Sequence, residues 1–222
     1  MYAKLGVMEK AQVVFDELPT HSVPSWTALI AGYAQHGKGN EALSCFKEMQ
    51  DEGHFPNEIT FFCALKACTS IGAIGKGEGI LVEVSRQGLL RKSTSLCNAV
   101  VDMYAKCCML AKAKESFDEL PTRDASSWNS LITGYIDHGL FDKAIDCLGK
   151  MQDEGVGPDA VTFVCILKAC GHIQALKKGE EIHAEVQRQG LLDKHGMLAT
   201  TLVYMYAKCG VMAKAQEVQN RL

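Results

Sequence analysis

The feature that most constrains this chain is a repeat with a period of 102 residues. Tyr2, Tyr104 and Tyr206 lie in the strings MYAKLG, MYAKCC and MYAKCG, and each is 102 residues from the next. Trp26 and Trp128, in SWTALIAGYAQHG and SWNSLITGYIDHG, keep the same spacing. About half of the positions compared across this offset are identical, which a shared amphipathic pattern alone does not produce. The fold must therefore be built from similar pieces placed one after another.

Each period divides further into stretches in which apolar residues recur at helical spacing. One apolar stripe, at residues 128–135, ends before Gly139, and the next, at residues 141–151, ends before Gly155 and Pro158. This pattern predicts a helix-turn-helix hairpin. No segment shows the period-two alternation of a half-exposed strand.

The hairpins define seven repeats, numbered here 1 to 7, of which the first and last are incomplete. They comprise residues 1–22, 23–57, 58–93, 94–124, 125–159, 160–195 and 196–222. The complete repeats rotate through 35, 36 and 31 residues, which we call standard, long and short. Because such a hairpin cannot bury its apolar face alone, neighbours must stack. The predicted fold is all-α, a right-handed superhelical solenoid forming one continuous array.

Composition excludes several other classes of protein. The 222 residues carry a net charge of -3, without the basic excess of a nonspecific duplex binder. No apolar run is long enough to span a membrane, and residues 1–10 resemble neither a signal peptide nor a transit peptide. Met1 falls in register with Met103 and Met205, inside a hairpin, so we expect a piece of a longer array.

The ten cysteines do not have the pattern of a disulfide scaffold or a metal site. Cys63, Cys68, Cys165 and Cys170 sit inside apolar helical segments, where reduced thiols pack as small hydrophobic groups. Cys108 stands where the next period has Gly210, so it replaces a glycine that ends a helix. We expect no metal and no cofactor.

Two further features have structural interpretations. Gly72, Gly75, Gly77 and Gly79 lie at the junction and start of a helix and lack the spacing of a phosphate-binding loop, so we expect them to weaken that helix rather than to bind a ligand. The two tryptophans are candidates for base stacking, but core packing between hairpins is the favoured interpretation.

The strings SWNSLITGY, VTFVCILKAC with GEEIHAEV, and LVYMYAKCGVMAKA together resemble the pentatricopeptide repeat family, specifically its plant PLS class. The resemblance covers essentially the whole chain. A tetratricopeptide solenoid has a uniform 34-residue period, which the three-length rotation does not match. Some members of the PLS class carry a zinc deaminase, whose signature is H-x-E followed later in the chain by P-C-x-x-C. His183-Ala184-Glu185 matches the first part, but no cysteine pair with the spacing of the second part is present. We therefore expect no enzyme activity.

The resemblance implies that single-stranded RNA lies along the first helices, with one base read per repeat. In the family the fifth and last residues of a repeat read the base, and the second residue flanks it. The reading residues carried over in this way are Thr27 with Asn57, Asn98 with Asp124, and Asn129 with Asp159. The resemblance implies adenine for the first pair and uracil for the other two, a preference of the form A-x-U-U-x.

The remaining positions of this pattern are weaker candidates for contact with RNA. The long repeats place Phe62 with Ser93 and Val164 with His195 at the reading positions, and an apolar fifth residue cannot hydrogen-bond a base edge. The other candidates are Ser22, Pro24, Ser95, Ser126 and Thr200. An alternative stays open for the principal pairs, in which the Asn and Thr residues are ordinary first-turn residues and the Asp residues cap helices.

The function that the resemblance implies is sequence-specific RNA binding in the editing or processing of RNA, in a plant mitochondrion or chloroplast. An editing-factor protein or a deaminase is the partner implied beside RNA. The alternative function is a protein-interaction solenoid that binds a peptide or an editing-cofactor protein, which the acidic net charge keeps open.

Overall fold

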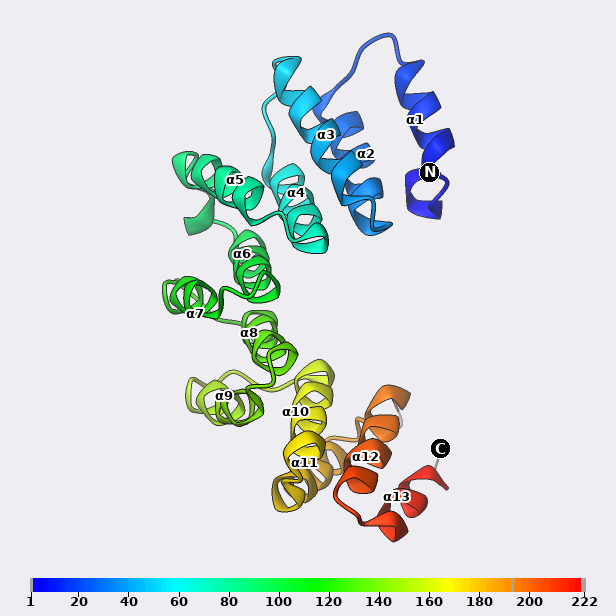
Figure 1. Ribbon diagram of the computed structural model, residues 1–222, viewed down its shortest axis with the longest axis vertical. Coiled ribbons are helices and arrows are strands. Elements are labelled where there is room, and N and C mark those ends of the chain that lie inside the picture. Colours follow the sequence, from blue (N-terminus) through cyan, green and yellow to red (C-terminus); the bar gives the residue numbers. More distant parts are fainter. Residues whose placement is uncertain (1, 193, 221–222) are drawn as a thin grey trace. The chain divides into compact units, whose positions relative to one another are not determined.

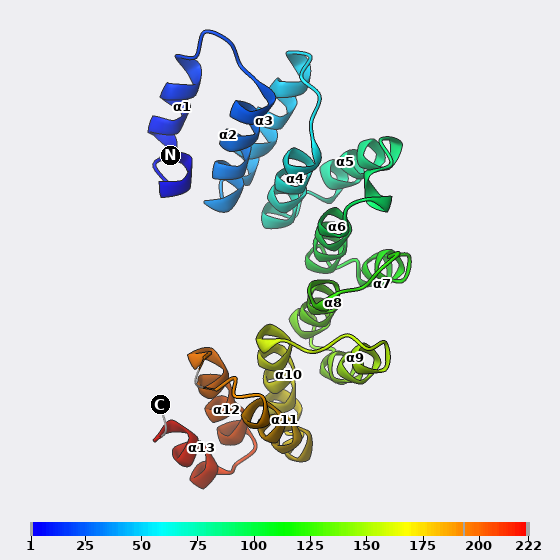
Figure 2. The ribbon, with the colours of Figure 1, turned by 180° about the vertical axis from the view of Figure 1, so that it is seen from behind.

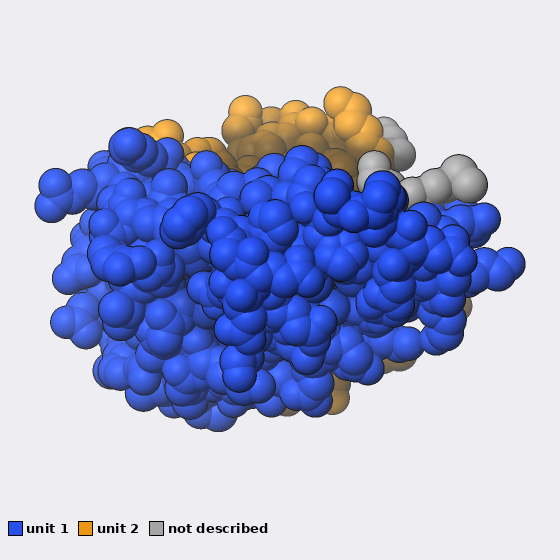
Figure 3. Space-filling model, turned by 90° about the horizontal axis from the view of Figure 1, so that it is seen from above, with its two compact units in different colours: residues 1–121 blue, residues 122–222 orange. Residues whose placement is uncertain are grey.

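The computed structural model describes residues 2–192 and 194–220, which form 13 α-helices and two short 3-10 helices (Figure 1). The described residues contain no strand, so the predicted all-α class is confirmed. The chain divides into two compact units, residues 1–121 (unit 1) and 122–222 (unit 2), which Figure 3 colours separately.

Unit 1 consists of consecutive antiparallel helices. The elements are η1 (Tyr2–Leu5), α1 (Met8–Asp16), α2 (Val23–Gln35), α3 (Gly39–Asp51), α4 (Glu58–Ile71), α5 (Ile74–Arg86), η2 (Leu89–Arg91), α6 (Thr94–Lys106) and α7 (Leu110–Asp118). The first helices pack against each other in the order α2, α4, α6. Figures 1 and 2 show α4 and α6 in one row, with α5 and α7 in a second row beside them.

Unit 2 has the same plan. Its elements are α8 (Ala125–Asp137), α9 (Phe141–Asp153), α10 (Ala160–Ile173), α11 (Leu176–Arg188), α12 (Gly196–Lys208) and α13 (Met212–Gln219). The first helices again pack in sequence, α8 on α10 and α10 on α12, while α9 and α11 contact the first helix that follows them. Hairpins stacked through their first helices are the building principle of a helical solenoid.

Four first helices begin at a reciprocal capping box. Ser22, Asn57, Asp124 and Asp159 precede α2, α4, α8 and α10, and each side chain accepts a hydrogen bond from the backbone N–H three residues later. The hydroxyl of that third residue accepts in return from the N–H of the capping residue. These boxes explain why the helices start at the predicted repeat boundaries.

The turn after each first helix requires a left-handed residue, which usually is glycine. Gly210 has a φ of 77° after α12, and at the equivalent place after α6 Cys108 has a φ of 62°. Cys108 therefore occupies a glycine position, as its place in the repeat predicts. Gln174, with a φ of 56°, likewise stands where unit 1 has Gly72.

The core lies between the helices of each hairpin and its neighbour. Trp26 and Trp128 are 2% and 3% exposed, which confirms their predicted role in packing. Cys63, Cys68 and Cys170 are buried, whereas Cys165 is only half-buried. None of the ten cysteines forms a disulfide. Burial raises the pKa of Cys68 and of Cys170 to about 11.

One of the glycines in residues 72–79 also has a packing role. Gly77 is buried against α6, and a Cβ at this position would collide with the sulfur of Met103. Gly179, its equivalent in unit 2, meets Met205 in the same way. These glycines permit close approach of the second helix to the next first helix, which the helix propensity of one segment does not reveal.

Among the described residues, no helix is both long enough and apolar enough to cross a bilayer.

Candidate nucleic-acid interface

The fifth, ninth and thirteenth residues of each complete first helix form one face, because residues four apart in an α-helix lie one above the other. We call this face the first-helix stripe. In unit 1 it comprises Thr27, Ala31, Gln35, Phe62, Lys66, Ser70, Asn98, Asp102 and Lys106. In unit 2 it comprises Asn129, Thr133, Asp137, Val164, Lys168, His172, Thr200, Tyr204 and Lys208.

The structure brings Asn129 and Asp159 into direct contact. The Nδ2 group of Asn129, on α8, donates to both carboxylate oxygens of Asp159, at 3.1 and 3.2 Å. The hydroxyl of Thr162 lies 2.7 Å from Asn129 Oδ1 and 3.0 Å from Asp159 Oδ1, so it can donate to either. The half-buried amide of Asn129 is therefore held in a fixed orientation at the start of the stripe.

Asp159 serves as helix cap and amide partner at once. Its Oδ1 atom accepts the Thr162 backbone N–H at 2.8 Å. Burial opposes ionisation, but the hydrogen bonds from the Thr162 backbone, the Asn129 amide and the Thr162 hydroxyl outweigh it and lower the pKa of Asp159. The carboxylate is thus charged at neutral pH and acts as an acceptor only.

Thr27 and Asn57 are linked through a third residue. The hydroxyl groups of Thr27 and Thr60 share a hydrogen bond at 2.8 Å, and Thr60 Oγ1 lies 2.9 Å from Asn57 Oδ1. Thr27 is 9% exposed and also donates to the Val23 carbonyl at 2.7 Å, whereas Asn57 is exposed. In this pair the exposed amide of Asn57 is accessible to a ligand, whereas the hydroxyl of Thr27 is nearly buried.

Asn98 and Asp124 belong to different compact units. Asn98 lies on α6 in unit 1 and is only 8% exposed. Asp124 lies in unit 2, where its Oδ1 atom accepts from the Ser127 backbone N–H at 2.8 Å and lies 2.9 Å from the Ser127 hydroxyl. The pairing of Asn98 with Asp124 on one base remains a prediction.

The weaker candidates differ in their accessibility. Ser93 is 5% exposed, caps α6 and donates to Glu58 at 2.6 Å, so its hydroxyl is occupied within the fold. Val164 is buried, and Phe62 is half-buried under the ammonium group of Lys66. The exposed candidates are Ser22, Pro24, Ser95, Ser126, His195 and Thr200.

Sequence reasoning missed the buried hydroxyl beneath the reading pairs. Thr60, Ser127 and Thr162 are each fully buried and sit three residues after Asn57, Asp124 and Asp159. Their spacing from the capping residue is a capping-box signal that the sequence contains. Their contacts with Thr27 and Asn129, on the preceding repeat, needed the packed structure.

The motif that resembles half of a deaminase signature has other partners. His183 Nδ1 lies 2.8 Å from the Tyr206 hydroxyl, and Glu185 forms an ion pair with Arg188 at 2.5 Å. Hydrogen bonds from the Arg188 and Gln189 side chains, together with the charge of Arg188, lower the pKa of Glu185 to about 2. Over the described residues, no three His, Cys, Asp or Glu side chains are grouped so as to hold a metal ion.

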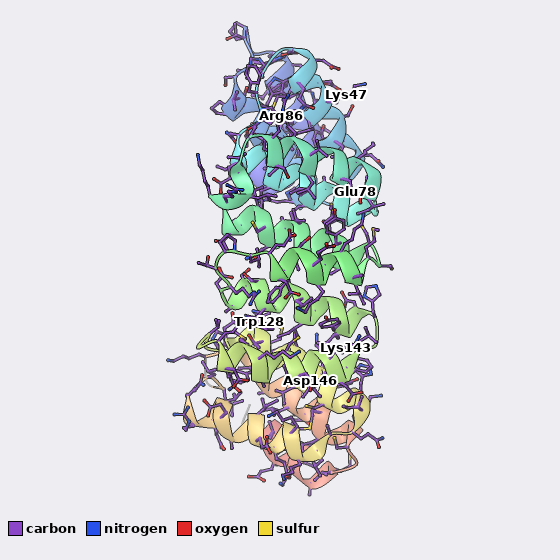
Figure 4. The ribbon with its side chains drawn as sticks, turned by 90° about the vertical axis from the view of Figure 1, so that its left-hand side faces the viewer. Lys47, Glu78, Arg86, Trp128, Lys143 and Asp146 are labelled. Atoms are coloured by element: carbon purple, nitrogen blue, oxygen red, sulfur yellow. The ribbon has the colours of Figure 1, made fainter. Side chains whose placement is uncertain are left out.

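The second helices present a different surface. Figure 4 labels Lys47 on α3, Glu78 and Arg86 on α5, and Lys143 and Asp146 on α9. Charges of both signs alternate there, and many are paired, as Glu78 is with Lys112 at 2.6 Å. Mixed, mutually paired charge is typical of a solvated face.

Comparison with known proteins shows which family the chain resembles. The model of the PPR repeat family matches residues 21–70 and 123–172, and a PPR repeat model matches residues 95–124. A pentatricopeptide repeat-containing protein of Arabidopsis thaliana is 38% identical over 86% of the chain and 24% of its own length. A mitochondrial one is 34% identical over 98% of the chain and 36% of its own length. A chloroplastic pentatricopeptide repeat-containing protein of the same plant is 36% identical over 97% of the chain and 40% of its own length.

Solved structures share the fold. The crystal structure of PPR10 with an 18-nucleotide psaJ RNA element superposes with a TM-score of 0.76 and 21% identity, over 99% of this chain and 33% of that one. The crystal structure of PPR10 from maize superposes with a TM-score of 0.71 and 21% identity, over 100% of this chain and 32% of that one. The chain thus spans about a quarter to two fifths of the length of these relatives.

Proposed function

Because this chain belongs to the pentatricopeptide repeat family, we propose that it binds single-stranded RNA along the first-helix stripe, reading one base per repeat. The observation that carries the proposal is the Asn129–Asp159–Thr162 cluster. The carboxylate and the hydroxyl hold the Asn129 amide in place, while this half-buried amide keeps an N–H and an oxygen lone pair for a ligand.

The chemistry of that amide suits uracil. The Watson–Crick edge of uracil presents an N–H between two carbonyl oxygens, so one Asn side chain can accept from the N–H and donate to a carbonyl. Asp159 fixes the orientation of the Asn129 amide, since a carboxylate accepts and never donates at neutral pH and the Nδ2 group must therefore face it. This supports the assignment of uracil to repeat 5, within the preference A-x-U-U-x.

The wider biological role is also proposed. We propose that the chain belongs to the plant PLS class, which the rotation of 35, 36 and 31 residues supports, and that it acts without catalysis as a specificity factor for the editing or processing of RNA. The mitochondrial and chloroplastic relatives support an organellar site of action. A deaminase or an editing-factor protein is the partner that such a role requires.

The test replaces Asp159→Asn and measures RNA binding by gel shift. The substitution keeps the helix cap but turns a pure acceptor into an amide, which releases the orientation of Asn129. We expect altered preference at the fourth base of A-x-U-U-x and unchanged preference elsewhere.

A matched control is Asp146→Asn, which makes the same change of charge on the second helix α9 (Figure 4). This variant should bind like the wild type. A uniform loss of affinity for all sequences in Asp159→Asn, or no change at all, would contradict the base-reading role. Absence of binding to any RNA would favour a protein-interaction solenoid instead.

A further inference from the structure

The ninth position of the stripe carries a lysine in both long repeats. Lys66 on α4 and Lys168 on α10 are equivalent across the 102-residue period. Each follows the apolar fifth residue by one helical turn, so it lies on the face that carries the reading positions of the neighbouring repeats. The two lysines nevertheless have different surroundings.

In unit 1 the charge of the lysine is neutralised. Asp102, on α6, is 7% exposed and its carboxylate lies 2.7 Å from the ammonium group of Lys66. The same carboxylate is 3.1 Å from Lys106, one turn further along α6. One nearly buried acid therefore engages both basic groups of this part of the stripe.

In unit 2 the acid is replaced by a ring, because Tyr204 stands where unit 1 has Asp102. The Tyr204 hydroxyl lies 3.3 Å from His172 Nε2, and the ammonium group of Lys208 lies 5.7 Å from the ring centroid. Lys168 is exposed and forms no salt bridge with any carboxylate in the described parts of the chain. Asp137, the one acidic residue of the stripe in unit 2, is therefore not paired with Lys168.

We propose that Lys168 contacts a backbone phosphate of the bound RNA. The residue at the ninth position of the following short repeat, Asp102 for Lys66 and Tyr204 for Lys168, decides whether the lysine of the long repeat is available for this contact. The proposal rests on the RNA binding proposed above. Phosphate contacts position a nucleic acid without reading its sequence, which an exposed ammonium group beside an apolar fifth residue is suited to do. The long repeat thus anchors RNA in unit 2, whereas Asp102 cancels the equivalent anchor in unit 1.

The first test compares Lys168→Gln with Lys66→Gln. Affinity for an A-x-U-U-x RNA and for a scrambled RNA is measured by fluorescence anisotropy over a series of salt concentrations. Each phosphate contact contributes about 0.7 to the slope of log affinity against log salt for single strands. Lys168→Gln should reduce the slope by about 0.7, equivalent to about fivefold weaker binding at 0.1 M salt, for both RNAs. Lys66→Gln should leave the slope unchanged.

The second test exchanges the deciding residues. Asp102→Tyr removes the partner of both Lys66 and Lys106, so it should steepen the slope by at least about 0.7. Tyr204→Asp supplies an acid for Lys168 and should flatten the slope as Lys168→Gln does. Helical circular dichroism and the midpoint of thermal unfolding check that each variant is folded.

The outcomes separate this proposal from the one on which it rests. Sequence-specific binding by the wild type, with equal slopes for the wild type and Lys168→Gln, would overturn the role of Lys168 alone. Equal losses from Lys66→Gln and Lys168→Gln would overturn the role of residues 102 and 204. No binding of the wild type to either RNA would overturn both proposals.

Discussion

At the scale of single residues, the reading candidates are also structural. Asn57, Asp124 and Asp159 each cap the next first helix, so a residue that is predicted to meet a base also fixes where the following first helix begins. The capping interpretation and the reading interpretation of these side chains are therefore compatible. Losing such a cap costs about 0.5–2 kcal/mol of stability.

The lowered pKa of Asp159 predicts a pH dependence of stability. A carboxyl group whose pKa is lower in the folded state stabilises the fold above its unfolded-state pKa, and this contribution is lost as the pH falls through the folded-state pKa. Urea unfolding should therefore show that the stability advantage of the wild type over Asp159→Asn shrinks on acidification. A difference that is the same at acidic and neutral pH would contradict the hydrogen-bonded geometry.

At the scale of elements, the hairpin turns are the least regular part of the repeat. Cys108 and Gln174 adopt left-handed conformations that their equivalents Gly210 and Gly72 adopt without a steric penalty. A left-handed residue with a side chain costs about 1–2 kcal/mol, offset in part by the smaller chain entropy that it loses on folding. The two periods thus provide matched turns with and without glycine.

We predict that Cys108→Gly and Gln174→Gly each raise the free energy of unfolding by about 0.5–1 kcal/mol. The reciprocal changes Gly210→Cys and Gly72→Gln should lower it by a similar amount. Chemical denaturation with a constant m-value checks both directions. Destabilisation by Cys108→Gly would show that the thiol makes contacts worth more than the strain.

At the scale of the whole chain, the two compact units repeat one plan with different surface chemistry. Unit 1 neutralises the lysines of its stripe through Asp102, whereas unit 2 leaves Lys168 exposed. With a net charge of -3, the chain has little general attraction for phosphate, so under the proposed function we expect such local differences to decide where RNA is held.

The distribution of thiols over the chain predicts a pattern of chemical reactivity. Cys108 is exposed, whereas burial raises the pKa of Cys45 to about 12 and that of Cys68 and Cys170 to about 11. A thiol reacts as the thiolate, so buried thiols with a raised pKa are inert. Maleimide labelling at pH 8, followed by peptide mass spectrometry, should find Cys108 modified first and all ten cysteines modified after denaturation. Early labelling of Cys68 or Cys170 would contradict the packing between hairpins.

The sequence by itself determined the all-α class, the helix starts and the buried face of each hairpin. These follow from the 102-residue period, from helical spacing of apolar residues such as those around Trp128, and from caps that act within four residues. Such signals are local, so they can be read before the chain is folded.

Only the tertiary structure decided which side chains meet across hairpins. Asn129 meets Thr162, Lys66 meets Asp102, and Gly77 makes room for Met103, although the partners are at least 26 positions apart in the sequence in each case. The burial of Asn98 and the difference between the two long-repeat lysines arise in the same way. Contacts of this kind depend on how stacked helices fit together, and the spacing of residues within one helix does not contain that information.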